Sequence, residues 1–417
     1  MGLHRFRWFP PLHPASFTHL TMLLKVVYLL PNLRRGGTER RVVRLVNHGE
    51  WSSEVHLMFS TGAPGENDPD LLHALEQAGV KVRHLGLRGF RHPLRWWPTL
   101  QAVRRWRDAI REAAPDLVHA FLPSANILAL MATPHTGEVT GRRDLPRIIL
   151  SQSALGRYRR RQPMLGTLER MLYPRAAMIV CNSEAVRADL LLSIPRIRPS
   201  HAEVVYNGVE FRPSATPWST PLERAEWRAR HAGVEPGEAL LLMVANLIPY
   251  KGHDLAIQSL AFLPPTCRVR LVLVGGDPQG WQAHLERIAL IHGVADRVAF
   301  VGPVADPQPW YGAADLLLAP SHEEGFSNTI VEAMAARLPV VATRVGGTPE
   351  ALGEEFPGLL QEYPTPEVFA GVVAQLLAKP SELEALGLEL EQRFREQFTL
   401  AHMGTAMLNI YQEVMAR

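Results

Sequence analysis

The sequence predicts an α/β protein made of two doubly wound domains that face each other across a cleft. The chain has 417 residues, which is longer than one hydrophobic core usually grows, so two domains are expected. Short runs rich in Val, Ile and Leu alternate with longer helical patterns along the whole chain, which is typical of βαβ units. A proline-rich segment divides this alternation into two halves.

The first half contains six apolar runs that we interpret as strands of one parallel sheet. They are K-V-V-Y-L-L (25–30), E-V-H-L-M-F-S (54–60), V-K-V-R-H-L (80–85), L-V-H-A-F-L (117–122), R-I-I-L-S-Q (147–152) and M-I-V-C-N-S (178–183). Their nearly continuous apolar character indicates strands buried on both faces. We therefore assign residues 22–210 to the first domain. Residues 1–21 are expected to be an N-terminal tail, with Met22 as an alternative start of the chain.

The second half repeats the same alternation after a linker. Three prolines with serine and threonine in residues 211–221 preclude a regular element, so this segment is the predicted linker. Five predicted strands follow it, at 239–247, 269–276, 298–302, 316–321 and 339–345. Residues 222–399 then form the second domain. The helical segment 400–417 is expected to cross back and brace the first domain.

Composition and charge limit the class of protein. The chain is 47% apolar and 20% charged, as ordinary globular proteins are, and no apolar run approaches the roughly 18 to 20 residues that span a bilayer. We therefore expect a soluble, cytoplasmic protein. The formal net charge is +3, and arginines cluster in the first half. Such clusters favour acidic phospholipid headgroups, a phosphate-bearing acceptor or nucleic acid, although solvated helix faces explain any single arginine.

The segment S-H-E-E-G-F-S-N-T-I-V-E-A-M-A-A (321–336) carries the strongest functional signal. It follows a predicted strand directly, and Ser327 or Asn328 is expected to cap the helix that comes next. The backbone N–H groups of residues 325–327 then remain free at the positive end of that helix, which is a favourable place for phosphate. Glu332, about one turn further on, can reach hydroxyl groups beside that phosphate.

These residues resemble glycosyltransferase family 4 of the retaining GT-B enzymes, whose mark is a Glu-x7-Glu pair, here Glu324 and Glu332. The resemblance implies two Rossmann-like domains and a nucleotide-sugar donor bound in the cleft between them. It implies that Glu332 binds the ribose hydroxyls and that Glu324 touches the transferred sugar. The residues around the donor diphosphate would be Gly325, Phe326, Ser327 and Asn328.

The segment L-M-V-A-N-L-I-P-Y-K-G-H (242–253) resembles the part of the family in which a basic pair neutralises the leaving diphosphate. Lys251 matches one member of that pair. Asn246 stands where many relatives carry arginine, and its amide donates hydrogen bonds but brings no charge. A missing cationic contact costs on the order of a few kcal/mol in a desolvated site unless another arginine or a helix end replaces it.

Two further candidates lie in the first domain. Gly36 and Gly37 separate the first strand from its helix and are similar to the family's G-G-x-E-R loop, which implies contact with the donor phosphates or the acceptor. His119 occupies the first position of an H-x-H pattern that several relatives carry, while Phe121 occupies the second. The resemblance implies a catalytic contact for His119, against the plain alternative of a core histidine. The G-x-G-x-x-G fingerprint is absent, which argues against a dehydrogenase.

Together these motifs predict a retaining glycosyltransferase that moves a sugar from a nucleoside diphosphate to an acceptor, such as a lipid-linked or cell-surface glycan. No metal or other cofactor is expected, because the scattered histidines lack the spacing of metal ligands. Peripheral contact with the inner face of the membrane is expected through the basic first domain. The basic, aromatic stretch 94–106 is interpreted as an amphipathic helix facing an acceptor or a membrane, so no nucleic acid is expected. The alternatives are a nucleotide-sugar epimerase or hydrolase, or a catalytically silent sugar-nucleotide or polysaccharide-binding protein.

Overall fold

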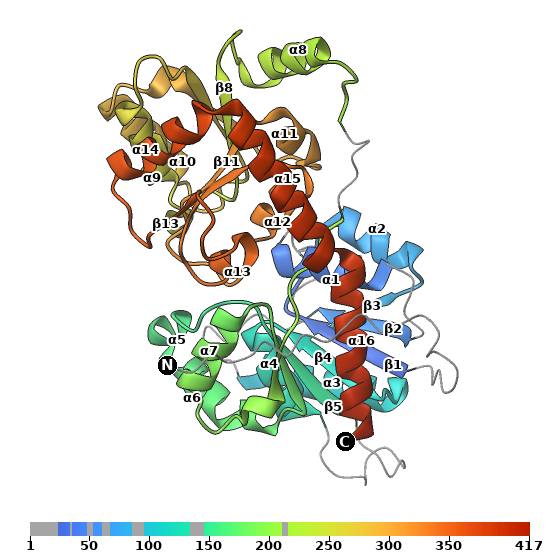
Figure 1. Cartoon of the computed structure of the whole chain (residues 1–417). Helices are drawn as coiled ribbons and strands as arrows, with labels where there is room; N and C mark the ends of the chain where they lie inside the picture. Colours follow the sequence, from blue (N-terminus) through green and yellow to red (C-terminus); the bar gives the residue numbers. More distant parts are fainter. Residues whose placement is uncertain are drawn as a thin grey trace.

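The computed structural model describes residues 24–33, 36–47, 53–60, 67–85, 96–133, 146–210 and 216–417. Over these residues the chain forms two α/β domains stacked end to end (Figure 1). This confirms the predicted fold class. The expected tail, residues 1–21, and the first part of the expected linker, residues 211–215, lie outside the described residues.

The first domain is built on a seven-stranded sheet in the order β3-β2-β1-β4-β5-β6-β7, with every neighbouring pair parallel. The strands are β1 (Leu24–Leu30), β2 (Ser53–Ser60), β3 (Lys81–His84), β4 (Leu117–Phe121), β5 (Arg147–Gln152), β6 (Met178–Cys181) and β7 (Ala202–Val204). The six predicted strands are present. The short edge strand β7 is added to them.

Helices cover both faces of this sheet. They are α1 (Gly37–Asn47), α2 (Pro69–Gln77), α3 (Trp96–Ala113), α4 (Pro123–Ala132), α5 (Tyr158–Arg161), α6 (Pro163–Leu172) and α7 (Glu184–Ser193). Helices α3, α4 and α7 contribute to the core on one face, and α1 and α2 to the core on the other. Trp106 of α3 is fully buried in the first of these cores, and its Nε1 donates to Oγ1 of Thr133 at 3.1 Å. Trp106, at the end of the stretch 94–106, thus belongs to the buried face of α3, while Arg104, Arg105 and Arg107 are exposed.

The second domain contains a six-stranded parallel sheet in the order β10-β9-β8-β11-β12-β13. The strands are β8 (Ala239–Val244), β9 (Val269–Val274), β10 (Val298–Gly302), β11 (Leu316–Ala319), β12 (Val340–Thr343) and β13 (Leu359–Leu360). The helices are α8 (Pro221–Ala232), α9 (His253–Ser259), α10 (Gln282–Ile291), α11 (Gln308–Ala313), α12 (Asn328–Ala335), α13 (Thr348–Leu352), α14 (Pro366–Leu377) and α15 (Pro380–Gln397).

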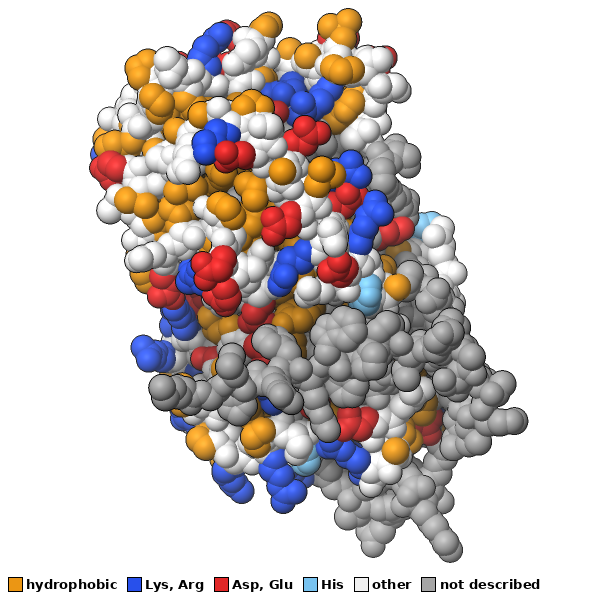
Figure 2. Space-filling view, viewed as in Figure 1, with side chains coloured by type: hydrophobic (Ala, Val, Ile, Leu, Met, Phe, Trp, Pro, Cys, Tyr) orange, Lys and Arg blue, Asp and Glu red, His pale blue; other side chains and the backbone are white. Residues whose placement is uncertain are grey.

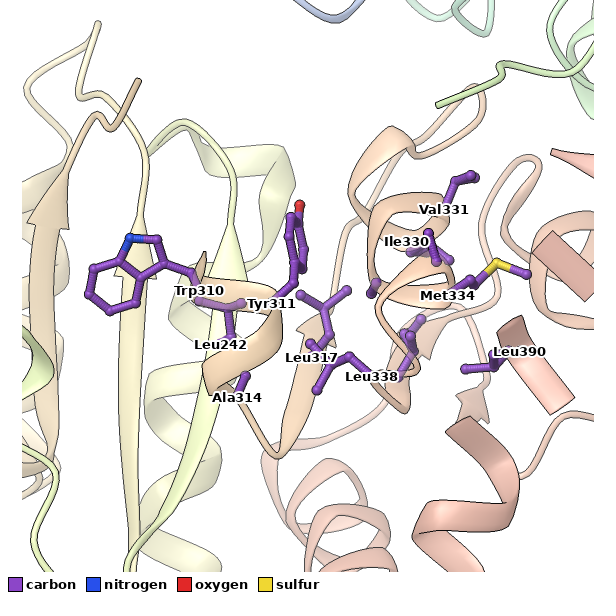
Figure 3. Close-up of a cluster of buried hydrophobic side chains, with 14 of the residues drawn as sticks. Leu242, Trp310, Tyr311, Ala314, Leu317, Ile330, Val331, Met334, Leu338 and Leu390 are labelled. Carbon is purple, nitrogen blue, oxygen red and sulfur yellow. The ribbon is translucent and has the colours of Figure 1, made fainter. Parts of the chain in front are cut away.

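Helix α12 is held in place by its apolar face. Ile330, Val331 and Met334 point from α12 into the core, where Leu317 of β11 and Leu390 of α15 also lie (Figure 3). All five side chains are at most 1% exposed. The end of α12 that carries the predicted site is thereby fixed against the sheet, because burying this apolar face is the main force that holds an amphipathic helix.

The last helix, α16 (Leu400–Ala416), lies against the first domain, to which the sequence analysis expected it to return (Figure 1). Met403, Met407 and Tyr411 belong to the same core as Tyr28 of β1. The Tyr411 hydroxyl donates to the Tyr28 hydroxyl at 3.2 Å. The two domains are thus connected twice, once by the segment before α8 and once by the turn between α15 and α16. No helix in the described part of the chain is both long and apolar enough to cross a bilayer.

Candidate active site

A pocket of about 360 Å³ lies between the two domains, at the carboxyl ends of the strands of both sheets. Ligands in doubly wound sheets bind at this edge, because the loops that follow the strands converge there. The residues predicted from sequence that line this pocket are Gly36, Gly37, Asn246, Lys251, Glu324, Phe326, Ser327, Asn328 and Glu332. Gly325 and His119 are the two predicted residues outside that lining.

The amino end of α12 faces this pocket. Ser327 is the N-cap, and its Oγ accepts from the backbone N–H of Ile330 at 3.4 Å. Thr329, in the first turn, donates its hydroxyl to the carbonyl of Val244 at the end of β8, at 3.0 Å. The sequence left Ser327 and Asn328 as alternative caps, and the structure selects Ser327. The positive end of an eight-residue helix therefore borders the pocket.

Lys251 and Glu324 form an ion pair on one wall of the pocket. Nζ of Lys251 lies 2.5 Å from Oε1 of Glu324, and the Ser321 hydroxyl donates to the same oxygen at 2.9 Å. Burial lowers the pKa of Lys251, but the neighbouring Glu324 carboxylate more than offsets this effect, so the pKa is raised overall. Lys251 therefore remains a cation, and an entering anion would compete with Glu324 for it.

Two glycines allow close backbone contacts beside Lys251 and Glu324. Gly252 has a φ of +72°, and a Cβ there would overlap the carbonyl oxygen of Pro320. Gly346 has a φ of +50°, and a Cβ there would overlap the carbonyl oxygen of Glu324. Both positions require glycine for two reasons, the left-handed backbone and the lack of space.

Glu332 is held from both domains. Its Oε1 accepts from Nη2 of Arg44 at 3.2 Å, and its Oε2 accepts from the hydroxyl of Tyr311 at 2.8 Å. Arg44 belongs to α1 of the first domain, so this ion pair joins the domains across the pocket. Sequence reasoning missed Arg44 and Tyr311. The available signal for Arg44 was its place one helical turn after Arg40, on the helix that follows the glycine pair.

We expect the Arg44–Glu332 pair to contribute to stability beyond what an exposed ion pair does. The two side chains are 24% and 14% exposed, so removing one leaves a partly desolvated charge behind. A double-mutant cycle of Arg44→Ala and Glu332→Gln, measured by chemical denaturation, should give a coupling free energy of about 0.5–3 kcal/mol.

The matched control for that cycle is the exposed pair of Arg83 and Glu112, whose side chains are 40% and 63% exposed. Its coupling free energy should be only about 0.2–1 kcal/mol. Equal coupling energies in the two cycles would show that the pair across the pocket is no more than a surface ion pair.

Asn246 has a structural hydrogen bond and brings no charge. Its Oδ1 accepts from the backbone N–H of Gly276 at 3.2 Å, which ties the loop after β8 to the loop after β9. The cations that line the pocket with Lys251 come instead from the first domain, where Arg40, Arg41 and Arg44 project from α1. Arginines of α1 can therefore supply the positive charge that Asn246 lacks.

The glycine pair allows α1 to approach α12 closely. A Cβ at Gly37 would lie 3.2 Å from Nδ2 of Asn328, which is closer than most real contacts of that kind. Oδ1 of Asn328 accepts from Nδ2 of Asn207 of the first domain at 2.8 Å. Gly37 therefore serves contact between the domains as well as the lining of the pocket.

Gly325 lies just behind the lining, at a contact between the domains. Its carbonyl oxygen accepts from the Ser183 hydroxyl at 2.8 Å and from the backbone N–H of Gly347 at 2.9 Å. A Cβ at this position would overlap the carbonyl oxygen of Ser153. The structure thus gives Gly325 a role in bringing the domains together, in addition to the predicted proximity to the donor.

His119 is not brought to the pocket. It is fully buried in the first domain, with Nδ1 2.7 Å from the hydroxyl of Tyr411 and Nε2 2.9 Å from Oγ of Ser151. Its ring stacks on Phe121 with the centroids 4.2 Å apart. Burial, and then the charge of Arg41, lower the pKa of His119 well below 6.5, so the imidazole is neutral. This corrects the expectation of a catalytic His119, because β4 directs the side chain toward α16.

A second pocket of about 310 Å³ lies in the first domain and shares Ser153 with the pocket between the domains. It is lined by Leu122, Pro123, Ser124, Ser151, Gln152, Ser153, Ala154, Tyr158, Gln162 and Leu165. Nε2 of Gln152 donates to the carbonyl of Ala154 at 2.7 Å, while its buried Oε1 has no partner among the described residues. Leu122 has a φ of +72°, which is uncommon for a residue other than glycine.

The chain also matches known families. The family described as Glycosyltransferase Family 4 matches residues 35–212, and the family described as Glycosyl transferases group 1 matches residues 238–379. The chain belongs to these glycosyltransferases. Among curated relatives, the D-inositol 3-phosphate glycosyltransferase of Segniliparus rotundus is 34% identical over 231 residues, which are 52% of this chain and 48% of the relative. That of Mycolicibacterium gilvum is 31% identical over 260 residues, 61% and 56% of the two chains. The match spans about half the length of these relatives.

Solved structures share the whole fold. The structure of Anabaena Alr3699/HepE in complex with UDP and glucose has a TM-score of 0.76 at 20% identity and covers 94% of this chain and 100% of its own. Sucrose-phosphate synthase from Thermosynechococcus elongatus has a TM-score of 0.73 at 19% identity, with 94% and 99% covered. At these identities the likeness concerns the fold, which is the predicted GT-B arrangement of two Rossmann-like domains.

Proposed function

We propose that the protein is a glycosyltransferase that moves a sugar from a nucleoside diphosphate to a hydroxyl group of an acceptor. The observation that carries this proposal is the convergence of Lys251, Glu324, Glu332 and the amino end of α12 on one pocket between two doubly wound sheets. Family membership supports it, as does the UDP and glucose complex of a protein with the same fold. That complex favours a uridine nucleotide as the first donor to try.

The contacts of the pocket suggest how the donor lies. The diphosphate would bind at the amino end of α12 and beside Lys251, because both provide positive charge. Glu332 would accept hydrogen bonds from the ribose hydroxyls, and Glu324 would do so from the sugar. Arg40 and Arg44 of α1 would approach the same anion from the other domain and supply the charge that Asn246 lacks.

The proposed reaction needs positioning and charge stabilisation rather than an enzyme nucleophile. The acceptor oxygen forms a bond to the anomeric carbon while the bond from that carbon to the diphosphate oxygen breaks, and the departing diphosphate takes the acceptor proton. Attack on the face that the nucleotide leaves would retain the anomeric configuration. Lys251 and the N–H groups of α12 would stabilise the developing negative charge without a metal ion.

The second pocket is the proposed acceptor site. It opens beside Ser153, which also lines the pocket between the domains, and within its mainly apolar lining the serine, glutamine and tyrosine side chains can hydrogen-bond the hydroxyl groups of an acceptor such as a glycan. The unpartnered Oε1 of Gln152 provides a buried acceptor for one of those hydroxyls. The curated relatives are named for an inositol 3-phosphate acceptor, so a polyol phosphate belongs in the acceptor panel with lipid-linked glycans.

The test is thermal unfolding with a panel of nucleotides and nucleotide sugars. A ligand present at about 100 times its dissociation constant should stabilise the protein by about 2.7 kcal/mol, which gives a rise in Tm of a few degrees for a chain of this size. Glu332→Gln should lose most of that rise, because the neutral amide cannot serve as a charged acceptor for the ribose hydroxyls. Glu226→Gln, on the exposed side of α8, is the matched control and should keep it.

Turnover assays then separate the alternatives. Transfer with retention to any acceptor supports the proposal. Release of free sugar in the presence of every acceptor favours a hydrolase, and a change in the sugar of the donor favours an epimerase. A Tm rise without any turnover favours a silent binding protein, and no rise with any nucleotide would contradict the donor site itself.

A further inference from the structure

The outer side of α5, α6 and the turn after them carries an unusual concentration of exposed cations. We define the α5–α6 surface as Arg160, Arg161, Met164, Arg170, Met171 and Arg175, all of which are exposed. Figure 2 shows blue Lys and Arg side chains along the lower left of the first domain, where Figure 1 places α5, α6 and α7. These residues lie in a fully described part of the chain, and none of them lines either pocket.

The positive charge of this surface is not compensated within its own segment. The single carboxylate between residues 157 and 175 is that of Glu169, whose side chain is 0% exposed and accepts from Nε of Arg159 at 2.6 Å. On the neighbouring helix α7, Asp189 also pairs with Arg159, at 3.3 Å, and Glu184 pairs with Arg187 at 3.1 Å. Arg159 and Arg187 thus take up these three carboxylates. Arg161 also interacts with Glu323 of the second domain, whereas no ion pair of Arg160, Arg170 or Arg175 is found among the described residues.

Two long apolar side chains stand among these arginines. Met164 is 73% exposed and Met171 is 62% exposed, although α6 otherwise buries Gly166 and Glu169. Positions seven residues apart lie on the same side of an α-helix, two turns from each other. Exposed apolar side chains within a basic face are the pattern of protein surfaces that rest on anionic membranes.

We propose that the α5–α6 surface binds an anionic lipid bilayer. The four arginines contact the lipid phosphates, and Met164 and Met171 enter the layer between headgroups and acyl chains. Tyr158 of α5 and Leu165 of α6 line the second pocket from the other side of the same helices. Docking therefore brings the wall of that pocket next to the bilayer. Delivery of a lipid-linked acceptor by this route rests on the proposed function, whereas membrane binding does not.

Vesicle co-sedimentation of the full chain tests this proposal. The protein should bind vesicles of phosphatidylcholine mixed with phosphatidylglycerol and should not bind phosphatidylcholine alone. Each arginine near an anionic surface contributes about fivefold in affinity, so the double variant R160E/R170E should bind at least about 25-fold more weakly. The matched control is R230E/R287E, which reverses two exposed arginines on α8 and α10 of the second domain. It should bind as the unmodified protein does.

The methionines have their own pair of variants. M164S/M171S should weaken binding to the mixed vesicles severalfold, whereas L290S, at a position of the second domain that is 69% exposed, should have no effect. Circular dichroism and thermal unfolding without ligand show whether each variant folds. Binding that is equal on both lipid compositions, or that R160E/R170E leaves unchanged, overturns the proposal. Equal weakening by R230E/R287E also overturns it, because net charge alone then explains binding. If no nucleotide raises the Tm of the unmodified protein, the proposed donor site is contradicted, but the proposal of membrane binding is not affected.

Discussion

Replacing Lys251 by methionine is expected to lower the rate of sugar transfer by about a hundredfold to a thousandfold, the usual cost of removing one group that stabilises developing charge. Lys251 lines the pocket and is buried enough that water replaces its charge poorly. Under the proposed reaction its contact with the diphosphate strengthens as the bond to the sugar breaks. The effect should therefore fall mainly on kcat, measured with saturating donor and acceptor.

A second variant separates this effect from damage to the fold. Methionine at position 251 leaves the Glu324 carboxylate, whose side chain is 13% exposed, without its cation, so some stability is lost. The double variant Lys251→Met/Glu324→Gln removes both charges and should regain stability, but it should not regain the rate. Lys379→Met, at an exposed lysine of the second domain, should leave the stability and the transfer rate unchanged. A rate that recovers with stability would show that Lys251 acts only through the fold.

The site residues that could be predicted from the sequence are those that directly follow strands. Lys251 comes after β8 and Glu324 after β11, and these strands are neighbours in the second sheet. Because all strands of this sheet are parallel, their carboxyl ends meet at one edge. Glu332 lies about one turn into α12, whose amino end comes directly after the loop that carries Glu324. The order of strands and helices along the chain was therefore sufficient to predict that these three residues lie in one pocket.

Contacts between the domains could not be predicted in this way. Arg44 and Glu332 are separated by 288 positions, and nothing in local periodicity relates an arginine of α1 to a carboxylate of α12. The wrong expectation for His119 has the same cause, a contact between residues that are far apart in the sequence. Its strand was predicted, but the position of Tyr411 depends on how α16 crosses back, and that contact places the imidazole in a core. The two-residue strand β13 was missed because it is too short for any pattern.

Replacing Gly346 by alanine is expected to reduce transfer by about a hundredfold or more, although Gly346 contacts no substrate in the proposed arrangement. The added Cβ would overlap the carbonyl oxygen of Glu324, so the segment that carries Glu324 must move away from β12. A misplacement of about 1 Å is enough to cost about a hundredfold in a reaction that depends on positioning. The left-handed backbone adds strain of about 1–3 kcal/mol, which thermal and chemical unfolding should detect.

Gly353→Ala is the matched control, because it introduces backbone strain without a steric overlap. Gly353 also has a positive φ, +101°, but a Cβ there would have no atom within 4 Å among the described residues. Gly353→Ala should therefore lose only the stability that backbone strain costs, and Gly346→Ala should lose more because the overlap adds to the strain. Only Gly346→Ala should lose transfer activity at a temperature where both are folded. If the two lose activity equally, strain in this segment explains the loss. If Gly346→Ala alone is impaired, the catalytic geometry depends on the close contact between the turn at Gly346 and the backbone of Glu324.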